Sequence, residues 1–246
     1  MPNESRTMRP KIICHMVTSI DGCLLVDRWT KQAAGIEADM LTSYYNEVPT
    51  RFHADGWIVG RKTMQYFARG AARTPGTVKG NLRDIHIAAR KDRDVAVSID
   101  PRGTLHYGQD NAEGDHIIAI LGEQVSDEYL AELREDDVSH LFAGAKGNDM
   151  NRALEILGDT FGVKTLFLEG GGITNGLFLK ERLIDEISLL VYPAIDGLAG
   201  IPSIFESAGK PNEQPAASQA LRHIATKGGM VWLRYNVEPS PAVSQS

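Results

Sequence analysis

The chain has 246 residues, which is long enough to bury a complete hydrophobic core as one large α/β domain. Its composition, 42% hydrophobic and 24% charged, is typical of a globular protein and excludes disordered and fibrous classes. The formal net charge of −6 argues against a general nucleic-acid binder, because neutralising phosphates requires a concentrated basic surface.

Cysteine content and targeting signals bear on where the protein works. The cysteines Cys14 and Cys23 form no CxxC pair and no zinc-ligand spacing, so neither a disulfide framework nor a metal site is indicated. The polar, basic start of the chain lacks the apolar core of a signal peptide, and no apolar run approaches the ~20 residues that span a bilayer. We therefore expect a cytoplasmic protein without membrane association, with a disordered segment over residues 1–10.

Strands and helices alternate in the first part of the chain. Apolar runs closed by glycine or small polar residues predict strands, and apolar residues at helical spacing predict helices, the first of them limited by Pro49. The predicted elements are a strand at 11–17, a polar turn at 18–22, a helix at 41–52, a strand at 56–59 and a helix at 61–67. A surface loop is expected over residues 69–81, because this stretch is rich in Gly, Arg, Thr and Pro and has no apolar period.

The same alternation continues to the end of the chain. Ser126 is a good N-cap for the helix that follows it. The predicted elements are strands at 85–89, 95–99, 116–121, 139–143, 165–168, 186–193 and 229–235, and helices at 127–134, 150–161 and 173–183. We therefore predict an α/β fold with a mostly parallel sheet, helices on both faces and an antiparallel C-terminal edge. One domain is expected over residues 11–237, followed by a disordered tail at 238–246.

A run of glycines lies where a predicted strand passes into a helix. Glu169 is followed by Gly170, Gly171 and Gly172, at the place where open α/β sheets hold ligands beyond the carboxyl ends of their strands. Glycines let the backbone approach a phosphate closely, and the first amides of a helix are unpaired and carry the positive end of its dipole. The segment indicates a site for a cofactor diphosphate; a tight turn alone is the alternative.

A second junction of strand and helix repeats this arrangement at Gly60. Arg61 offers a planar donor fork and Thr63 a hydroxyl group to phosphate oxygens. Neither junction matches a P-loop or a GxGxxG pattern, which disfavours kinases and ordinary Rossmann domains. Two phosphate-binding corners suit a dinucleotide, whereas an ordinary solvated helix start is the alternative for the second corner taken alone.

The combination of these segments resembles a known family. The segments are TSIDG at 18–22, VGRKT at 59–63 and LEGGGITNG at 168–176, continued by LIDE at 183–186, YP at 192–193 and VWLRY at 231–235. The chain is similar to the C-terminal reductase domain of the bacterial riboflavin-biosynthesis deaminase/reductase, in the dihydrofolate-reductase-like superfamily. The resemblance implies a stand-alone reductase that uses NADPH, a small-molecule substrate and a homodimer.

The resemblance also assigns residues to the cofactor. They are Thr18, Gly60, Arg61, Thr63, Asp100, Gly170, Gly171, Gly172, Ile173, Thr174 and Asn175. Asp100 resembles the family's acidic strand-end residue near the adenosine half. Arg90 and Arg102 are candidates for the 2′-phosphate, because a guanidinium group matches phosphate geometry.

Three polar residues are expected to face the substrate: Ser19, Asp21 and Glu169. We assign Asp21 and Glu169 as catalytic, because a carboxylate at a strand end near a nicotinamide can bind substrate hydroxyl groups and relay the proton that accompanies hydride. A turn-forming Asp-Gly pair is the alternative for Asp21. Trp29 lies in a polar neighbourhood and is a candidate for lining the substrate cleft.

The expected activity is therefore that of an NADPH-dependent oxidoreductase. By resemblance it reduces a phosphoribosylamino-uracil, with hydride transfer to the sugar C1′ or an imine of a pyrimidine-type substrate. A pterin-like or other small conjugated substrate is one alternative. A non-catalytic NADP-binding module is another, and it predicts cofactor binding without oxidation.

Overall fold

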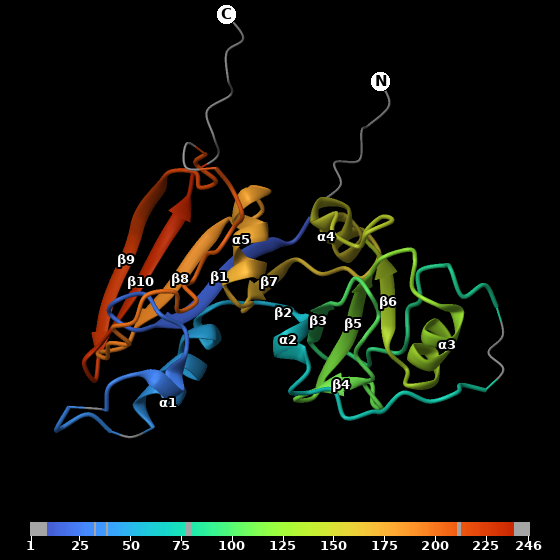
Figure 1. The fold of residues 1–246 in the computed structure, drawn as a ribbon, viewed down its shortest axis with the longest axis horizontal. Coiled ribbons are helices and arrows are strands. Elements are labelled where there is room, and N and C mark those ends of the chain that lie inside the picture. Colours follow the sequence, from blue (N-terminus) through green and yellow to red (C-terminus); the bar gives the residue numbers. More distant parts are fainter. Residues whose placement is uncertain (1–8, 32, 38, 77–79, 211–212, 239–246) are drawn as a thin grey trace, which may run out of the picture. The chain divides into compact units, whose positions relative to one another are not determined.

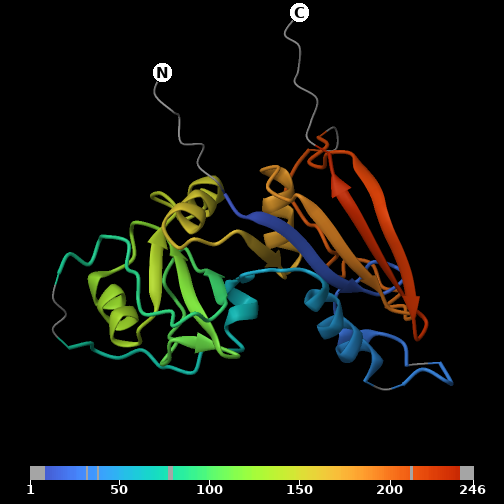
Figure 2. The same ribbon diagram turned by 180° about the vertical axis from the view of Figure 1, so that it is seen from behind.

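The computed structural model describes residues 9–31, 33–37, 39–76, 80–210 and 213–238. The chain forms two compact units, drawn in Figures 1 and 2. Unit 1 is built mainly from Ala54–Leu166, and unit 2 from Ile12–His53 and the chain from Phe167 onward. The predicted disordered segments, 1–10 and 238–246, lie almost entirely outside the described residues. The single domain expected over 11–237 stays a prediction.

Unit 1 holds a mostly parallel sheet. Its strands are β2 (Gly56–Gly60), β3 (Val95–Ile99), β4 (Asn111–Ala112), β5 (Asp115–Leu121) and β6 (Ser139–Phe142). Parallel pairs join β2 to β3, β3 to β5 and β5 to β6, whereas the short β4 is antiparallel to β5. Strand β5 is buried along almost its whole length, as expected for a parallel strand covered on both faces.

The helices of unit 1 follow from local signals in the sequence. They are α2 (Arg61–Met64), α3 (Asp127–Glu135) and α4 (Met150–Asp159). The predicted N-cap is confirmed, because the side chain of Ser126 accepts a hydrogen bond from the amide of Tyr129 at 3.2 Å. Helix α4 buries Met150, Ala153, Leu154 and Leu157, the spacing of one helical face.

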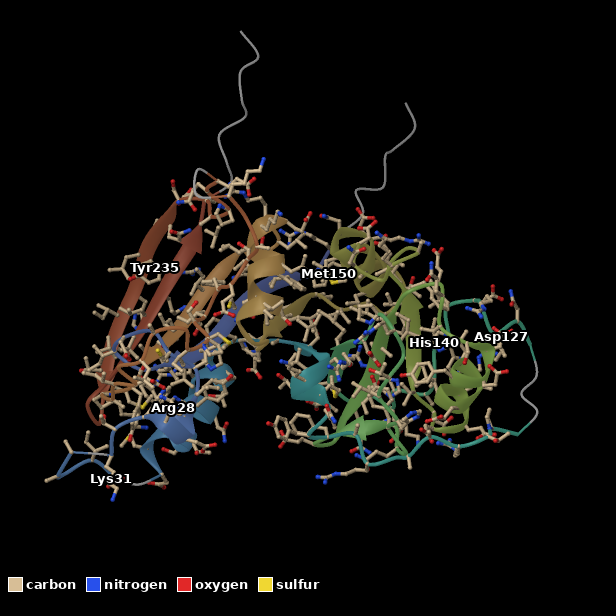
Figure 3. The ribbon with its side chains drawn as sticks, in the orientation of Figure 1. Arg28, Lys31, Asp127, His140, Met150 and Tyr235 are labelled. Atoms are coloured by element: carbon tan, nitrogen blue, oxygen red, sulfur yellow. The ribbon has the colours of Figure 1, made fainter. Side chains whose placement is uncertain are left out.

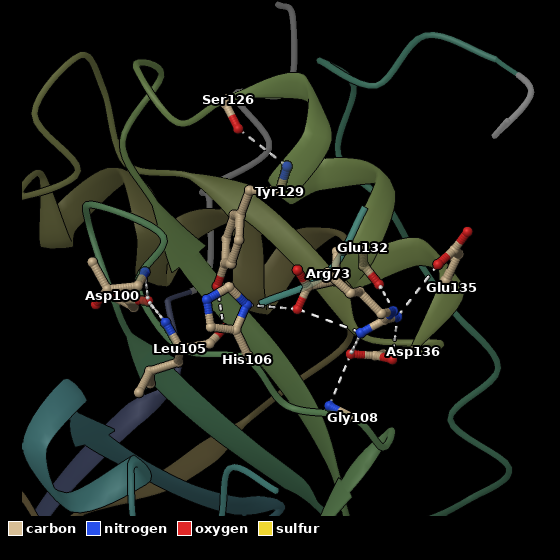
Figure 4. A network of polar contacts seen from close by, with 11 residues as sticks. Arg73, Asp100, Leu105, His106, Gly108, Ser126, Tyr129, Glu132, Glu135 and Asp136 are labelled. Atoms are coloured by element: carbon tan, nitrogen blue, oxygen red, sulfur yellow. Dashed lines mark hydrogen bonds and ion pairs between the residues drawn. The ribbon is translucent and has the colours of Figure 1, made fainter. Parts of the chain in front are cut away.

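Ion pairs and hydrogen bonds connect the loop predicted over 69–81 to α3 (Figure 4). Arg73 donates to the carboxylate of Asp136 at 2.7 Å, and the same carboxylate accepts from the amide of Gly108 at 2.8 Å. The buried Glu132 lies 2.7 Å from His106 Nδ1. The described part of this segment contains no helix or strand, as predicted, and residues 77–79 lie outside the described residues.

Unit 2 holds the antiparallel edge that the sequence predicts. Its sheet runs in the order β1 (Lys11–Thr18), β8 (Glu186–Val191), β10 (Met230–Val237) and β9 (Gln219–Lys227). Strands β1 and β8 are parallel, and β8, β10 and β9 are successively antiparallel. The predicted fold class, a mostly parallel sheet with an antiparallel C-terminal edge, is confirmed.

Two helices of unit 2 flank this sheet. Helix α1 (Met40–Glu47) continues into one 3₁₀ turn at Val48–Arg51 (η2), where Pro49 stands in the first turn. Helix α5 (Gly172–Lys180) follows β7 (Thr165–Leu168), and it lies in front of β1 and β8 in Figure 1 and behind them in Figure 2. It ends three residues before the predicted Leu183, because Arg182 takes a left-handed conformation with φ 57° and the Leu183 amide bonds to the Phe178 carbonyl group.

The strands of the sequence analysis differ from the structure at two places. Residues 85–89 form no strand and make only an isolated bridge between His86 and His140, with Ile85 and Ile87 exposed. Conversely, the structure contains β9 at Gln219–Lys227, where no strand is predicted from the sequence. Its residues are almost all exposed, so it lacks the apolar alternation that identifies a half-buried strand, and its pairing with β10 alone makes it a strand.

Candidate active site

The carboxyl end of β1 in unit 2 leads into a tight polar turn. The Thr18 hydroxyl group donates to the Cys23 carbonyl oxygen at 3.2 Å, and the Ser19 hydroxyl group accepts from the Cys23 amide at 3.0 Å. Ser19 also donates to Asp21 Oδ1 at 2.6 Å. The side chains of Thr18 and Ser19 are buried, so in this structure both hydroxyl groups organise the turn.

Asp21 joins this turn to the chain that follows β8. Its carboxylate accepts hydrogen bonds from the amides of Asp196 at 3.2 Å and Gly197 at 2.8 Å. The hydrogen bonds from Ser19 and from these amides lower the pKa of Asp21 to about 2. The exposed Asp21 is therefore ionised at neutral pH and accepts these hydrogen bonds, and its catalytic role stays a prediction.

Asp21→Asn is expected to weaken the joined turns in a pH-dependent way. The folded pKa, about 2, lies below the ordinary value of 3.8, so the contribution of the carboxylate is present above pH 3.8 and is lost as the pH falls through about 2. Urea denaturation across this range should show the stability gap between the wild type and the variant closing toward low pH. A gap that does not depend on pH would contradict this role.

Glu169 stands at the carboxyl end of β7 and interacts with Tyr45, a partly buried aromatic residue. Burial and a hydrogen bond with the Glu169 carboxylate both hold the pKa of Tyr45 well above its ordinary value. Tyr45, from α1, also stacks on His15 of β1 with ring centroids 4.6 Å apart. Burial lowers the pKa of His15 to about 4, so this histidine is a neutral core residue.

The glycine run after Glu169 makes an open corner at the start of α5. The first hydrogen bond of the helix runs from the Asn175 amide to the Gly171 carbonyl group at 3.0 Å, so the amides of residues 172–174 precede the helical ladder. Gly171 is exposed, and a Cβ atom built on it would meet nothing within 4 Å. The corner is therefore open at Gly171, beside the amides that begin α5, and a phosphate needs such space.

The other glycines of this segment serve close packing. A Cβ atom on Gly170 would lie 2.7 Å from the Thr174 side chain, and one on Gly172 would lie 2.3 Å from the Ser203 carbonyl oxygen. Asn175 is fully buried and donates to the Ile204 carbonyl oxygen at 3.0 Å. Its Oδ1 atom has no partner among the described residues, which leaves one buried acceptor beside the corner.

The segment 202–206 was not predicted from the sequence. The Glu206 amide donates to the Gly172 carbonyl group at 2.9 Å, and the Leu24 amide donates to the Pro202 carbonyl group at 3.0 Å. This segment thus touches both the start of α5 and the turn after β1. No local sequence pattern predicts this segment, because its contacts are with residues up to about 180 positions away in the sequence.

Unit 1 gathers the other predicted cofactor residues at the carboxyl ends of β2 and β3. Gly60 pairs with Ile99 in the parallel register, so Arg61 and Asp100 follow two neighbouring strand ends. Asp100 is fully buried, and its Oδ2 atom accepts from the amides of Thr104 and Leu105 at 2.6 and 2.8 Å. Its carboxylate therefore holds the turn that follows β3.

The two arginines considered for the 2′-phosphate differ in their surroundings. Arg90 donates to the carbonyl groups of Arg93 and Phe161, which engages its guanidinium group in unit 1. Arg102 is exposed on the turn that follows Asp100. Of the two side chains, Arg102 is the one open to a ligand.

The predicted residues thus form one group in each unit. Unit 2 brings together the turn after β1 and the glycine corner, through Thr18, Ser19, Asp21, Glu169, Gly170, Gly171, Gly172, Ile173, Thr174 and Asn175. Unit 1 brings together Gly60, Arg61, Thr63 and Asp100. Ile173 is 72% exposed, so an apolar side chain stands next to the open corner. In the part of the chain that the structure describes, no helix is long and apolar enough to cross a membrane.

Comparison with known proteins identifies the class of this fold. A solved structure of a pyrimidine reductase-like protein from Corynebacterium diphtheriae is similar with a TM-score of 0.65 at 17% identity, covering 94% of this chain and 93% of that one. The fold is therefore that of the pyrimidine reductase-like proteins. A model of the RibD C-terminal domain matches residues 10–231. The chain belongs to the RibD C-terminal domain family, which confirms the resemblance found in the motifs.

Two relatives share the same name. The 2,5-diamino-6-ribosylamino-4(3H)-pyrimidinone 5′-phosphate reductase of Methanothermobacter thermautotrophicus is 26% identical over 233 residues, covering 94% of this chain and all of the relative. The enzyme of that name from Aquifex aeolicus is 26% identical over 203 residues, covering 82% of this chain and 84% of the relative.

Proposed function

We propose that this chain is an NADPH-dependent reductase that transfers hydride to the sugar C1′ of a ribosylaminopyrimidine 5′-phosphate. The observation that carries the proposal is the open glycine corner at Gly171, two residues after Glu169. The names of the two relatives supply the substrate class. Membership of a reductase family favours this function over a non-catalytic NADP-binding module and over a pterin-like substrate.

The residues of unit 2 fit a bound dinucleotide. The amides at the start of α5, which precede its hydrogen-bond ladder, suit a diphosphate, and the exposed Ile173 offers apolar surface beside it. The buried, unpartnered Asn175 Oδ1 atom suits an amide donor. NADPH, when bound, supplies the hydride. Glu169 would bind the substrate and hold the proton that the substrate takes up together with the hydride, and Tyr45 would orient Glu169 through their hydrogen bond.

The residues of unit 1 are proposed to bind phosphate as well. Arg61 and Thr63 carry donor groups on the short helix after β2, and Arg102 is an exposed guanidinium group at the end of β3. Since the carboxylate of Asp100 is engaged by backbone amides, we propose that it shapes this turn rather than meeting the cofactor. That one dinucleotide contacts both corners stays a prediction.

Turnover assays test the function directly. The purified chain is mixed with NADPH and, in parallel, with the diamino-pyrimidinone ribosyl phosphate, its deaminated uracil form and dihydrofolate. Loss of NADPH absorbance with either ribosyl substrate, and formation of the ribityl product by mass spectrometry, is the expected result. Oxidation with dihydrofolate alone would favour the pterin alternative, and NADPH binding without any oxidation would favour the non-catalytic module.

We further propose that the chain forms a homodimer through a partly exposed apolar face of the unit 2 sheet. The apolar side chains that share this face in the strand register are Leu189 and Val191 of β8, Val231, Leu233 and Tyr235 of β10, and Leu221 and Ile224 of β9. Leu221 and Ile224 are 58% and 59% exposed, and Tyr235 is labelled in Figure 3. An apolar patch of three strands is typical of an interaction surface.

Ile224→Lys is expected to shift the dimer to monomer, because burying an unpaired ammonium group is costly. Leu198→Lys is the matched control, since Leu198 is 60% exposed in a loop. Sedimentation velocity should show dimer for the wild type and the control and monomer for Ile224→Lys. A monomeric wild type, or a dimer that survives Ile224→Lys, would contradict the proposed interface.

We also propose a cytoplasmic location. Cys14 and Cys23 are both free, buried thiols, which is in keeping with a reducing compartment. Cell fractionation should recover the protein with cytoplasmic markers, and recovery from a membrane or secreted fraction would contradict the proposal.

A further inference from the structure

A groove of about 560 Å³ lies beside the C-terminal end of α5 in unit 2. Its volume is in the range of small-molecule sites, about 300–1,000 Å³. The polar residues that line it include Lys180, Arg182, Ser207, Lys210 and Glu213. The glycine corner stands at the opposite end of this helix of 9 residues, about 13 Å away at the rise of an α-helix. The groove is therefore separate from the candidate active site.

Positive charge is concentrated in this groove. Its lining carries three cations and one carboxylate, in a chain whose formal net charge is −6. The carboxylate belongs to a local turn, because the Lys210 amide donates to Glu213 Oε2 at 3.2 Å and the Glu213 amide donates back to the Lys210 carbonyl group at 3.0 Å. An anion that enters the groove therefore meets an excess of positive charge.

The three cations of the groove differ from many basic side chains elsewhere in the fold. Arginines on several other elements have carboxylate partners, among them Arg28, Arg73, Arg93 and Arg234. Within the described residues, Lys180, Arg182 and Lys210 form no such ion pair. The dipole of α5 favours cations at its end, but Lys210 lies on another segment and is not explained by that effect. Like charges around one groove repel each other, and a bound anion removes this repulsion.

The donor groups of the lining suit a diphosphate. A guanidinium group, here that of Arg182, can bind two phosphate oxygens at once, and the ammonium groups of Lys180 and Lys210 pair with phosphate as compact charges. The exposed Ser207 adds a hydroxyl donor. Three cations match the charge of two adjacent phosphate groups better than that of one.

The segment 203–210 connects this groove to the glycine corner. The Glu206 amide donates to the Gly172 carbonyl group at 2.9 Å, and the Asn175 side chain donates to the Ile204 carbonyl oxygen at 3.0 Å. Ser207 follows directly and lines the groove. One stretch of chain thus contacts the first turns of α5 and, a few residues later, faces the end of the same helix.

We propose that this groove binds a diphosphate anion, and that the bound anion strengthens cofactor binding at the glycine corner. An anion shared by Lys210 and Arg182 holds the segment 203–210 against α5, so less flexibility is lost when the cofactor orders the corner. The anion site is independent of the proposed function, whereas its effect on the cofactor rests on that function.

Pyrophosphate is the probe for the site itself. Calorimetric titration into the chain saturated with NADP⁺ keeps the glycine corner occupied. Arg182→Gln and Lys210→Gln should each bind pyrophosphate about tenfold more weakly than the wild type. Lys164→Gln, an exposed cation directly before β7, is the matched control and should bind it as the wild type does. Inorganic phosphate should bind the wild type at least tenfold more weakly than pyrophosphate.

Fluorescence titration with NADPH tests the effect on the cofactor. Pyrophosphate should lower the Kd for NADPH about fivefold in the wild type and in Lys164→Gln, and leave it unchanged in Arg182→Gln and Lys210→Gln. Sodium chloride at the same ionic strength should not reproduce this change. If it does, the effect is general screening of charge and the proposed coupling is wrong.

The remaining outcomes separate the anion site from the proposed function. Equal pyrophosphate affinity in the wild type and both groove variants overturns the site, because the anion then binds elsewhere. Equal binding of phosphate and pyrophosphate overturns the diphosphate class. Pyrophosphate bound in the groove with the Kd for NADPH unchanged overturns the coupling. Binding that depends on Arg182 and Lys210 in a chain without affinity for NADPH supports the site and contradicts the proposed function.

Discussion

Replacing Glu169 by glutamine is expected to lower kcat by about 10²-fold or more and to leave the KM for NADPH unchanged. The carboxylate stands at the carboxyl end of β7, directly before the glycine corner, and is hydrogen-bonded to Tyr45. Glutamine keeps the size of the side chain and its carbonyl acceptor but cannot take up a proton. Stopped-flow measurement of NADPH oxidation isolates the hydride step from product release.

Glu181→Gln is the matched control, because Glu181 caps the far end of α5 in the same unit. The control should match the wild type in kcat and in both KM values. Equal kcat for Glu169→Gln and the wild type would remove Glu169 from the catalytic residues. A rise in the substrate KM alone would assign it to binding.

Two glycine substitutions at the start and in the middle of α5 are expected to act in opposite ways. A Cβ atom on Gly176 would lie 2.0 Å from the Glu206 carbonyl oxygen, whereas one on Gly171 would meet nothing within 4 Å. Gly176→Ala should therefore lower the free energy of unfolding by about 1–3 kcal/mol, because α5 and the segment at Glu206 must separate. Gly171→Ala should change it by less than about 0.5 kcal/mol.

Cofactor binding, unlike stability, should be affected by the substitution at Gly171. A methyl group at Gly171 projects into the space where the backbone amides meet a phosphate, so Gly171→Ala should raise the Kd for NADPH about tenfold at unchanged stability. Urea denaturation and fluorescence titration with NADPH measure the two quantities. Unchanged NADPH affinity in Gly171→Ala would show that the open corner does not receive the cofactor.

Local signals explain which elements could be predicted. The cap at Ser126, the strand that ends at Thr18 and the glycines after Glu169 depend on neighbours within a few residues, and all three lie where the sequence places them. The strand expected at 85–89 failed because apolar residues alone do not provide a partner, and this segment finds only one bridge. Strand β9 was not predicted for the opposite reason: it pairs with β10 but has almost no buried side chains.

The sequence by itself determined the family, the fold class and the two glycine corners, because these depend on residue types at short, fixed spacing. Only the tertiary structure decided what the polar groups do. It engaged Asp100 and Asp21 with backbone amides, placed Tyr45 against Glu169, and stacked Trp29 on Tyr192. Except for those of Asp100, these contacts join residues more than a hundred positions apart, and no local pattern encodes a contact that forms only when distant strands pair and bury their side chains.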